Sequence, residues 1–118
     1  MIKIYSKVNP KLLLLSIIKY EQINKKRQDL SPREEFLQVS CQNFDKDFLL
    51  KPHKHKELER NTNRTQEVWV VIKGKISAKF YDLNDEIIYE CILKDGDCAV
   101  TFRAGQSFEI IEQDTVYY

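Results

Sequence analysis

The residues of this chain best suited to chemistry are two histidines and a glutamate. His53 and His55 lie two positions apart. In an extended strand, residues i and i+2 point to the same side, so the two imidazoles are expected on one face. Glu67 opens the next apolar segment and can bring a carboxylate to that face if the two strands pair. Two imidazoles and a carboxylate form a ligand set for Fe(II) and similar divalent ions, so the pattern predicts a site for Fe, Mn, Zn or Ni.

A fourth polar residue is expected beside this set. In the strand expected after Gly105, the side chains of Gln106, Phe108 and Ile110 share one face. Phe108 and Ile110 are natural core residues, so Gln106 is predicted to point inward as well. Its amide oxygen is a weaker ligand than an imidazole, and Gln106 is therefore expected as a fourth metal ligand or as a hydrogen-bonding group for the substrate. Trp69 has the same parity as Glu67 and is expected to pack in the core.

A plainer interpretation stays open for the histidines. Lys51, Lys54 and Lys56 surround them, which is typical of a solvated surface strand. In that case His53 and His55 point outward and bind no metal.

The order of these motifs resembles that of a known superfamily. His-x-His, followed by a glutamate, six residues and a glycine at Gly74, resembles the first motif of the cupins. More narrowly, the chain resembles the WbuC-type cupins of bacterial surface-polysaccharide gene clusters over residues 28–118, most strongly over 48–76. The segments that carry this likeness are Ser31-Pro32-Arg33, residues 48–55, residues 67–74 and residues 114–117. The chain departs from the pattern in a longer insert between His55 and Glu67, and in having Gln106 where the second motif has a histidine.

The resemblance implies a fold and a set of functions. The fold is an antiparallel jelly-roll β-barrel with a pocket in its mouth, here over residues 35–118. Members of the family usually continue with a further strand after this point, which would make this chain a fragment. The function would be metal-dependent chemistry on a sugar or nucleotide sugar, in which Glu67 or His53 moves protons. A metal-free sugar isomerase or epimerase and a non-catalytic sugar-binding or regulatory module are the alternatives. Arg33 would meet an anionic substrate group, although a simple capping turn at Ser31-Pro32 is the favoured interpretation.

Composition narrows the classes of partner. The 118 residues are enough for one domain with a single core, and the net charge of +1 argues against general electrostatic binding of nucleic acid. Three cysteines cannot all pair and show no metal-binding spacing, so free thiols in a reducing cytoplasm are expected. A seven-residue apolar run at 12–18 is too short for a membrane span, and it lacks the cleavage site of a signal peptide.

The remaining pattern predicts the elements that position the site. Residues 1–34 are expected as an extension with an edge strand near the start and a helix over 11–26, because Asn9-Pro10 resembles a helix entry. Residues 56–65 are polar and are predicted as a surface loop. The outward side chains of Val68, Val70 and Ile72 are apolar, which predicts a homodimer. Strands are expected at 35–40, 47–51, 68–72, 75–81, 87–93, 98–102, 108–112 and 115–118, with Ile76, Ala78 and Phe80 inward.

Overall fold

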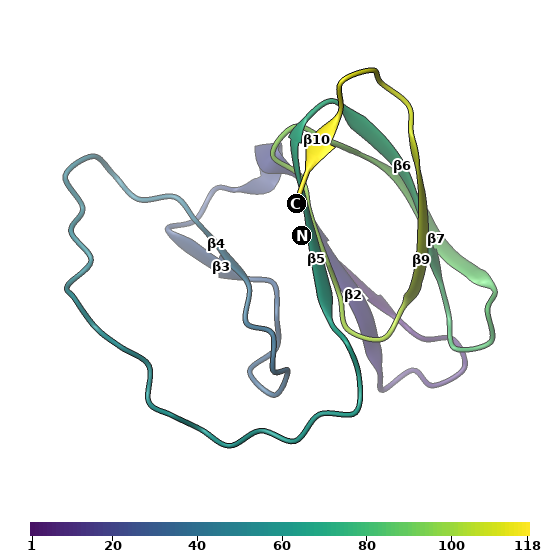
Figure 1. The fold of residues 1–118 in the computed structure, drawn as a ribbon, viewed down its shortest axis with the longest axis horizontal. Coiled ribbons are helices and arrows are strands. Elements are labelled where there is room, and N and C mark those ends of the chain that lie inside the picture. Colours follow the sequence, from purple (N-terminus) through teal and green to yellow (C-terminus); the bar gives the residue numbers. More distant parts are fainter.

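The computed structural model describes all 118 residues, and nearly every regular element in it is a strand (Figure 1). The elements are β1 (Ile2–Tyr5), β2 (Leu13–Ile18), a short 3-10 helix η1 (Tyr20–Gln22), β3 (Arg27–Asp29), β4 (Ser40–Gln42), β5 (Glu67–Lys73), β6 (Lys75–Tyr81), β7 (Ile87–Lys94), β8 (Cys98–Thr101), β9 (Gly105–Ile110) and β10 (Val116–Tyr117). Five strands form one sheet in the order β1-β2-β8-β5-β10, three form a second in the order β7-β6-β9, and β3 and β4 make a separate hairpin. The prediction of a mainly β chain with antiparallel sheets is confirmed, but the two sheets do not close into a barrel.

The core lies between the two sheets. Ile76, Ala78 and Phe80 alternate along β6 and are fully buried, as their spacing predicts. They face a layer of apolar side chains from the five-stranded sheet, in which the Trp69 ring lies 6.0 Å from that of Phe80. Burial of this kind contributes about 25 cal/mol per Å² of apolar surface, which makes it the main source of stability.

The predicted helix over residues 11–26 is wrong. Residues 13–18 form β2, which lies between β1 and β8, and all of its side chains are buried. A short apolar run suits a strand covered on both faces as well as it suits a buried helix. Asn9, expected as a helix cap, instead closes the β1–β2 turn, where its carbonyl accepts the Leu12 amide at 2.9 Å. No helix in the structure has the length and apolar character needed to cross a bilayer.

A second apolar cluster covers the outer face of the five-stranded sheet. Leu30, from the segment that carries the β3–β4 hairpin, packs there with Ile18, Val100 and Phe102. Val68 and Val70 pack against the same cluster, so the face expected to drive dimer formation is covered largely within one chain, and Ile72 alone of the three is exposed. The homodimer stays a prediction, but this face does not support it.

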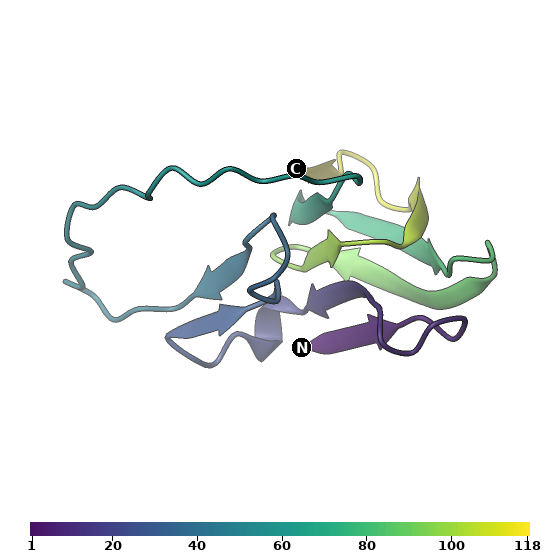
Figure 2. The same ribbon diagram turned by 90° about the horizontal axis from the view of Figure 1, so that it is seen from below.

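Residues 43–66, here called the connecting segment, contain no strand. The strand predicted at 47–51 is therefore wrong, and of the strand predicted at 35–40 only Ser40 belongs to one, as the first residue of β4. A turn with Asp47 at φ 67° replaces the first of these strands. The predicted loop at 56–65 is exposed throughout. The connecting segment runs out beside the β3–β4 hairpin, away from the two sheets (Figures 1 and 2).

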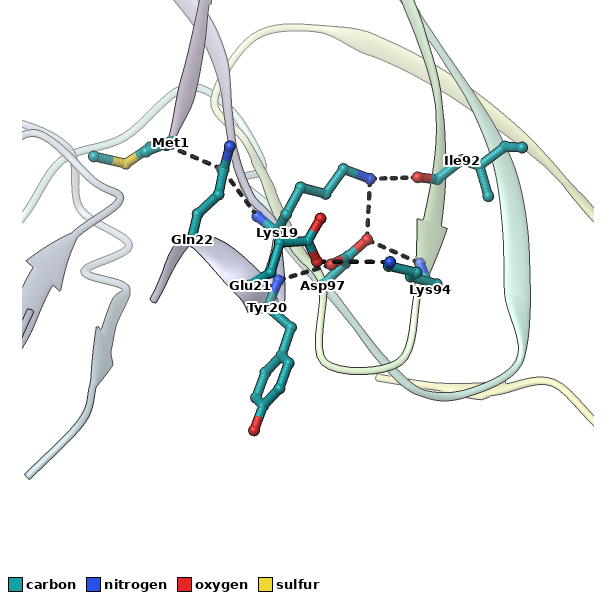
Figure 3. Close-up of polar contacts among 8 residues, drawn as sticks. All are labelled: Met1, Lys19, Tyr20, Glu21, Gln22, Ile92, Lys94 and Asp97. Carbon is teal, nitrogen blue, oxygen red and sulfur yellow. Dashed lines mark hydrogen bonds and ion pairs between the residues drawn. The ribbon is translucent and has the colours of Figure 1, made fainter. Parts of the chain in front are cut away.

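A buried aspartate fastens the N-terminal strands to the β7–β8 turn (Figure 3). Asp97 is fully buried and accepts hydrogen bonds from Lys19 Nζ at 3.0 Å, the Tyr20 amide at 2.9 Å and the Lys94 amide at 3.0 Å. Lys19 Nζ also donates to the Ile92 carbonyl. A buried charge is costly unless it is paired and hydrogen-bonded, and Asp97 meets both conditions.

Candidate functional site

Two of the predicted site residues meet where the two sheets face each other. Glu67 is the first residue of β5 and Gln106 is the second residue of β9. Gln106 pairs in register with Phe80, so its side chain lies on the core-facing side of its sheet, as predicted. From there Gln106 Nε2 donates a hydrogen bond to Glu67 Oε2. The alternation of residues along two separate strands thus brings a carboxylate and an amide together.

The amide of Gln106 is only half satisfied. Its Oε1 atom is buried and has no hydrogen-bond partner. A buried acceptor without a partner costs about 1–3 kcal/mol, so Gln106 would gain from any donor that reaches this oxygen. Glu67 is exposed, which leaves its carboxylate accessible to the same ligand.

An aromatic group adjoins the pair. Trp69 follows Glu67 on the same face of β5, and Phe108 follows Gln106 on β9. The Phe108 ring meets Trp69 edge-on, with centroids 5.2 Å apart, and meets Tyr117 of β10 in the same manner at 5.4 Å. Trp69 is buried, which confirms its expected core role, whereas Phe108 remains 43% exposed. Phe108 was expected in the core and is not enclosed there, because β9 is the last strand of its sheet.

We call this region the open side of the sandwich. β10 and the following Tyr118 pair with β5 from Lys73 to Val70, so no strand flanks β5 at Glu67. None of the five main surface cavities is lined by Glu67 or Gln106. The pair therefore lies at an accessible surface and not in an enclosed pocket.

The two histidines lie elsewhere. His53 and His55 are exposed on the connecting segment, with ring centroids 5.7 Å apart, and His53 Nδ1 is hydrogen-bonded to the Lys51 carbonyl at 3.0 Å. No group of three or more His, Cys, Asp or Glu side chains gathers in a way that could hold a metal ion. The structure joins Glu67 to Gln106 but does not bring the two imidazoles to them, so the metal site stays a prediction.

Arg33 is exposed and lies in a turn with no helix after it. The Ser31 hydroxyl accepts the Val39 amide at 3.0 Å, so the segment forms a turn, but no helix follows that Ser31 could cap. Arg33 lines a shallow cavity of about 290 Å³ together with Glu34 and with Arg60 and Asn61 of the connecting segment, so two positive charges there outweigh one negative charge. Two guanidinium groups in one hollow suit an anion, since arginine binds phosphate and carboxylate in a bidentate manner.

A buried polar cluster, absent from the sequence predictions, positions both site strands. Glu35 is 4% exposed, and its Oε1 accepts Arg103 Nη1 at 2.6 Å. Its Oε2 accepts Gln66 Nε2, and Gln66 Oε1 accepts the Leu37 amide at 3.0 Å. We call Glu35, Gln66 and Arg103 the clamp.

Each residue of the clamp lies close in sequence to a residue of the candidate site. Gln66 immediately precedes Glu67, Arg103 lies three residues before Gln106, and Glu35 lies two residues after Arg33. Arg103 Nη1 also donates to the Leu13 carbonyl at 3.1 Å, which fixes the clamp to β2. No local pattern could reveal these contacts, because Glu35 and Arg103 are 68 positions apart and each resembles a surface charge in sequence.

The chain matches no protein-family model, no curated protein and no solved structure. The case for the site therefore rests on its own residues and geometry.

Proposed function

We propose that this protein binds a sugar or nucleotide sugar at the open side of the sandwich, through Glu67 and Gln106 with Phe108 beside them. The observation that carries the proposal is the hydrogen bond from Gln106 to Glu67, next to an exposed aromatic ring and an unpartnered amide oxygen. Sugar hydroxyls both donate and accept, and the carboxylate and amide together offer both functions. The Phe108 ring supplies the apolar surface on which the C–H face of a sugar can pack.

The motif resemblance extends this proposal to the fold and the setting. We infer a cupin-type jelly roll acting in the cytoplasmic biosynthesis of a surface polysaccharide. Two antiparallel sheets facing each other, with Glu67 and Gln106 on facing strands, support that inference. Three cysteines that form no disulfide are compatible with a reducing compartment.

The cavity at Arg33 adds a role for an anionic group. In a nucleotide sugar the phosphates would bind Arg33 and Arg60, which line the same hollow. The contact between Gln66 and Glu35 joins the Arg33 turn to the start of β5. Replacement of both arginines with alanine should weaken binding of a nucleotide sugar and leave the affinity for the free sugar unchanged.

The test of the main proposal is calorimetric titration with a panel of sugars and nucleotide sugars. Glu67→Gln and Phe108→Ala should each reduce the affinity at least about tenfold, the effect of losing about 1.4 kcal/mol of binding free energy. Glu109→Gln is the matched control, because Glu109 lies on β9 and its side chain points to the opposite face of the sheet. Equal affinity in all three variants and the original chain would exclude this surface as the binding site. Turnover measurements on any ligand found would then separate an isomerase from a binding module.

A second candidate function is binding of a divalent metal by His53, His55 and Glu67, with Gln106 beside them. The observation that favours it is that the connecting segment carries both imidazoles on exposed residues and belongs to no sheet. The eleven residues that separate His55 from Glu67 can span up to about 40 Å when extended, so chain length does not keep the imidazoles from the open side. A bound metal would supply Lewis-acid polarisation of a substrate oxygen.

Titration of the chain with Fe(II), Mn(II), Zn(II) and Ni(II) tests this candidate. Gln106→His should tighten binding, because imidazole is the better ligand, and His53→Ala should abolish binding without loss of fold. Equal and negligible affinity in all three proteins would remove the metal site and leave the sugar proposal standing.

A further inference from the structure

β9 presents an unpaired backbone edge. It is the last strand of the order β7-β6-β9. The Ile111 amide donates to the Lys75 carbonyl of β6 at 3.1 Å, so the peptide groups of this residue face β6. In an antiparallel strand, the backbone amides and carbonyls of successive residues point alternately toward and away from the neighbouring strand. Those of Gln106, Phe108 and Ile110 therefore point away from β6, toward the open edge.

Apart from one charged residue, Glu109, this edge lacks the features that usually prevent association. Natural edge strands carry lysine or proline, are very short, or contain a bulge. β9 has six residues, Gly-Gln-Ser-Phe-Glu-Ile, and pairs with β6 without any shift of register. The other outer strands of the two large sheets are protected, since β1 has Lys3 and an irregular register, β7 has Lys94 and an irregular register, and β10 has only two residues.

Apolar side chains surround the same edge. Phe108 is 43% exposed and Ile110 is 44% exposed on the core-facing side of β9. Ile111 and Val116, in the connection to β10 and at its start, are also exposed. Adjoining apolar residues around an unprotected edge mark an interaction surface and not isolated exposure.

We propose that a second copy of the chain pairs with this edge, β9 against β9, antiparallel across a two-fold axis. The register that centres on Phe108 sets Gln106 opposite Ile110 of the second copy, so every outward peptide group finds a partner. It also sets Ser107 opposite Glu109 of the second copy, without like charges in contact. A register centred on Glu109 would place two carboxylates opposite each other. The result is a continuous six-stranded sheet, and this interface does not depend on which ligand the open side binds.

The connecting segment of the same chain is the competing occupant. It carries Lys51, Lys54 and Lys56 close to its apolar residues. It also runs on the far side of the molecule from β9 (Figures 1 and 2). The second copy fits better, because its edge repeats the spacing and the apolar character of β9 itself.

Sedimentation analysis of the full chain over a range of micromolar concentrations tests the proposal. Ile110→Lys should abolish the dimer, and Ile92→Lys, at an isoleucine 53% exposed on β7, is the matched control that should not. Ser107→Lys and Ser107→Glu both remove the hydrogen bond to Tyr81. The lysine would face Glu109 of the second copy with an opposite charge, whereas the glutamate would face it with a like charge. The dissociation constant of the Ser107→Lys dimer should be at least about fourfold lower than that of the Ser107→Glu dimer, since the favourable pair in the first and the like-charge pair in the second each occur twice.

Three results would overturn the proposal. One is a monomer at every concentration. Another is a dimer whose dissociation constant is equal in the Ile110→Lys and Ile92→Lys variants. The third is protection of the Phe108 amide from hydrogen exchange at concentrations where the chain is monomeric, which would assign the edge to the connecting segment.

Discussion

Glu35→Gln is the substitution that best tests how the clamp supports this fold. The change keeps the size of the side chain but removes the charge that pairs with Arg103. The two side chains are 5% and 15% exposed, so the pair is largely withdrawn from water. The Arg103 guanidinium would lose its carboxylate, and its Nε atom already has no partner.

The expected loss of stability follows from the burial of this pair. Removal of one partner from a buried ion pair costs about 3–5 kcal/mol, because an uncompensated charge stays in the interior. Glutamine still offers an acceptor oxygen, so the lower end, about 3 kcal/mol, is expected. For a domain of this size the melting temperature should fall by about 10 °C. That loss is a large share of the about 5–15 kcal/mol that separates folded from unfolded domains.

Urea unfolding, followed by the fluorescence of the single tryptophan, measures the effect. Trp69 is buried in the core and reports the loss of tertiary structure. Glu34→Gln is the matched control, because Glu34 is exposed one position away and should change the free energy of unfolding by less than about 0.5 kcal/mol. The double variant Glu35→Gln/Arg103→Met should recover part of the loss by removing the unpaired charge. If Glu35→Gln is no less stable than Glu34→Gln, the clamp does not hold this fold together.

Three further outcomes are expected. Burial tends to raise the pKa of Asp82, but hydrogen bonds from the Ser6 hydroxyl and backbone amides hold that pKa below its usual value. This stabilisation is present above the ordinary carboxyl pKa and is lost as pH falls through the folded-state pKa. Ser6→Ala removes one of the hydrogen bonds that lower this pKa, so the acid-unfolding midpoint, measured by tryptophan fluorescence, should move to higher pH. Burial, as the main cause, raises the pKa of Cys98 to about 12, so its alkylation at mildly alkaline pH should be far slower in native buffer than in urea, and equal rates by mass spectrometry would contradict this. Gly74 has φ +92°, and an added Cβ would lie 2.9 Å from the Thr115 Cα atom, so Gly74→Ala should reduce the urea-unfolding free energy by about 1–3 kcal/mol.

The parts of the fold that the sequence predicted are those set by local alternation. Ile76, Ala78 and Phe80 are separated by polar residues, and only one face of a strand can bury all three. β2 lacks such a signal, since its apolar residues are consecutive and fit a helix equally well until β1 and β8 cover both of its faces. Local sequence therefore predicts a strand with one buried face, whereas a strand buried on both faces depends on neighbours far away in the chain.

The same distinction explains the candidate site. Gln106 could be placed on an inward face because Phe108 and Ile110 mark that face of its strand. Glu67 opens a run that is apolar on both faces, so local sequence does not determine its partner. His53 and His55 lie in a segment without a paired neighbour, so their shared parity determines neither a face nor a partner.

The clamp and the candidate site act as one unit, and this has a consequence for function. The pair at the open side is itself solvent-accessible, and a single hydrogen bond between exposed groups contributes little to stability. Glu67 and Gln106 are held by the pairing of β5 with β8, by the contact of Trp69 with Phe108, and by the buried contacts of Gln66 and Arg103 with the Glu35 carboxylate. Loss of that carboxylate should loosen the start of β5 and the approach to β9 together. Ligand affinity should then fall in Glu35→Gln even below the temperature at which the chain unfolds, although Glu35 touches neither site residue.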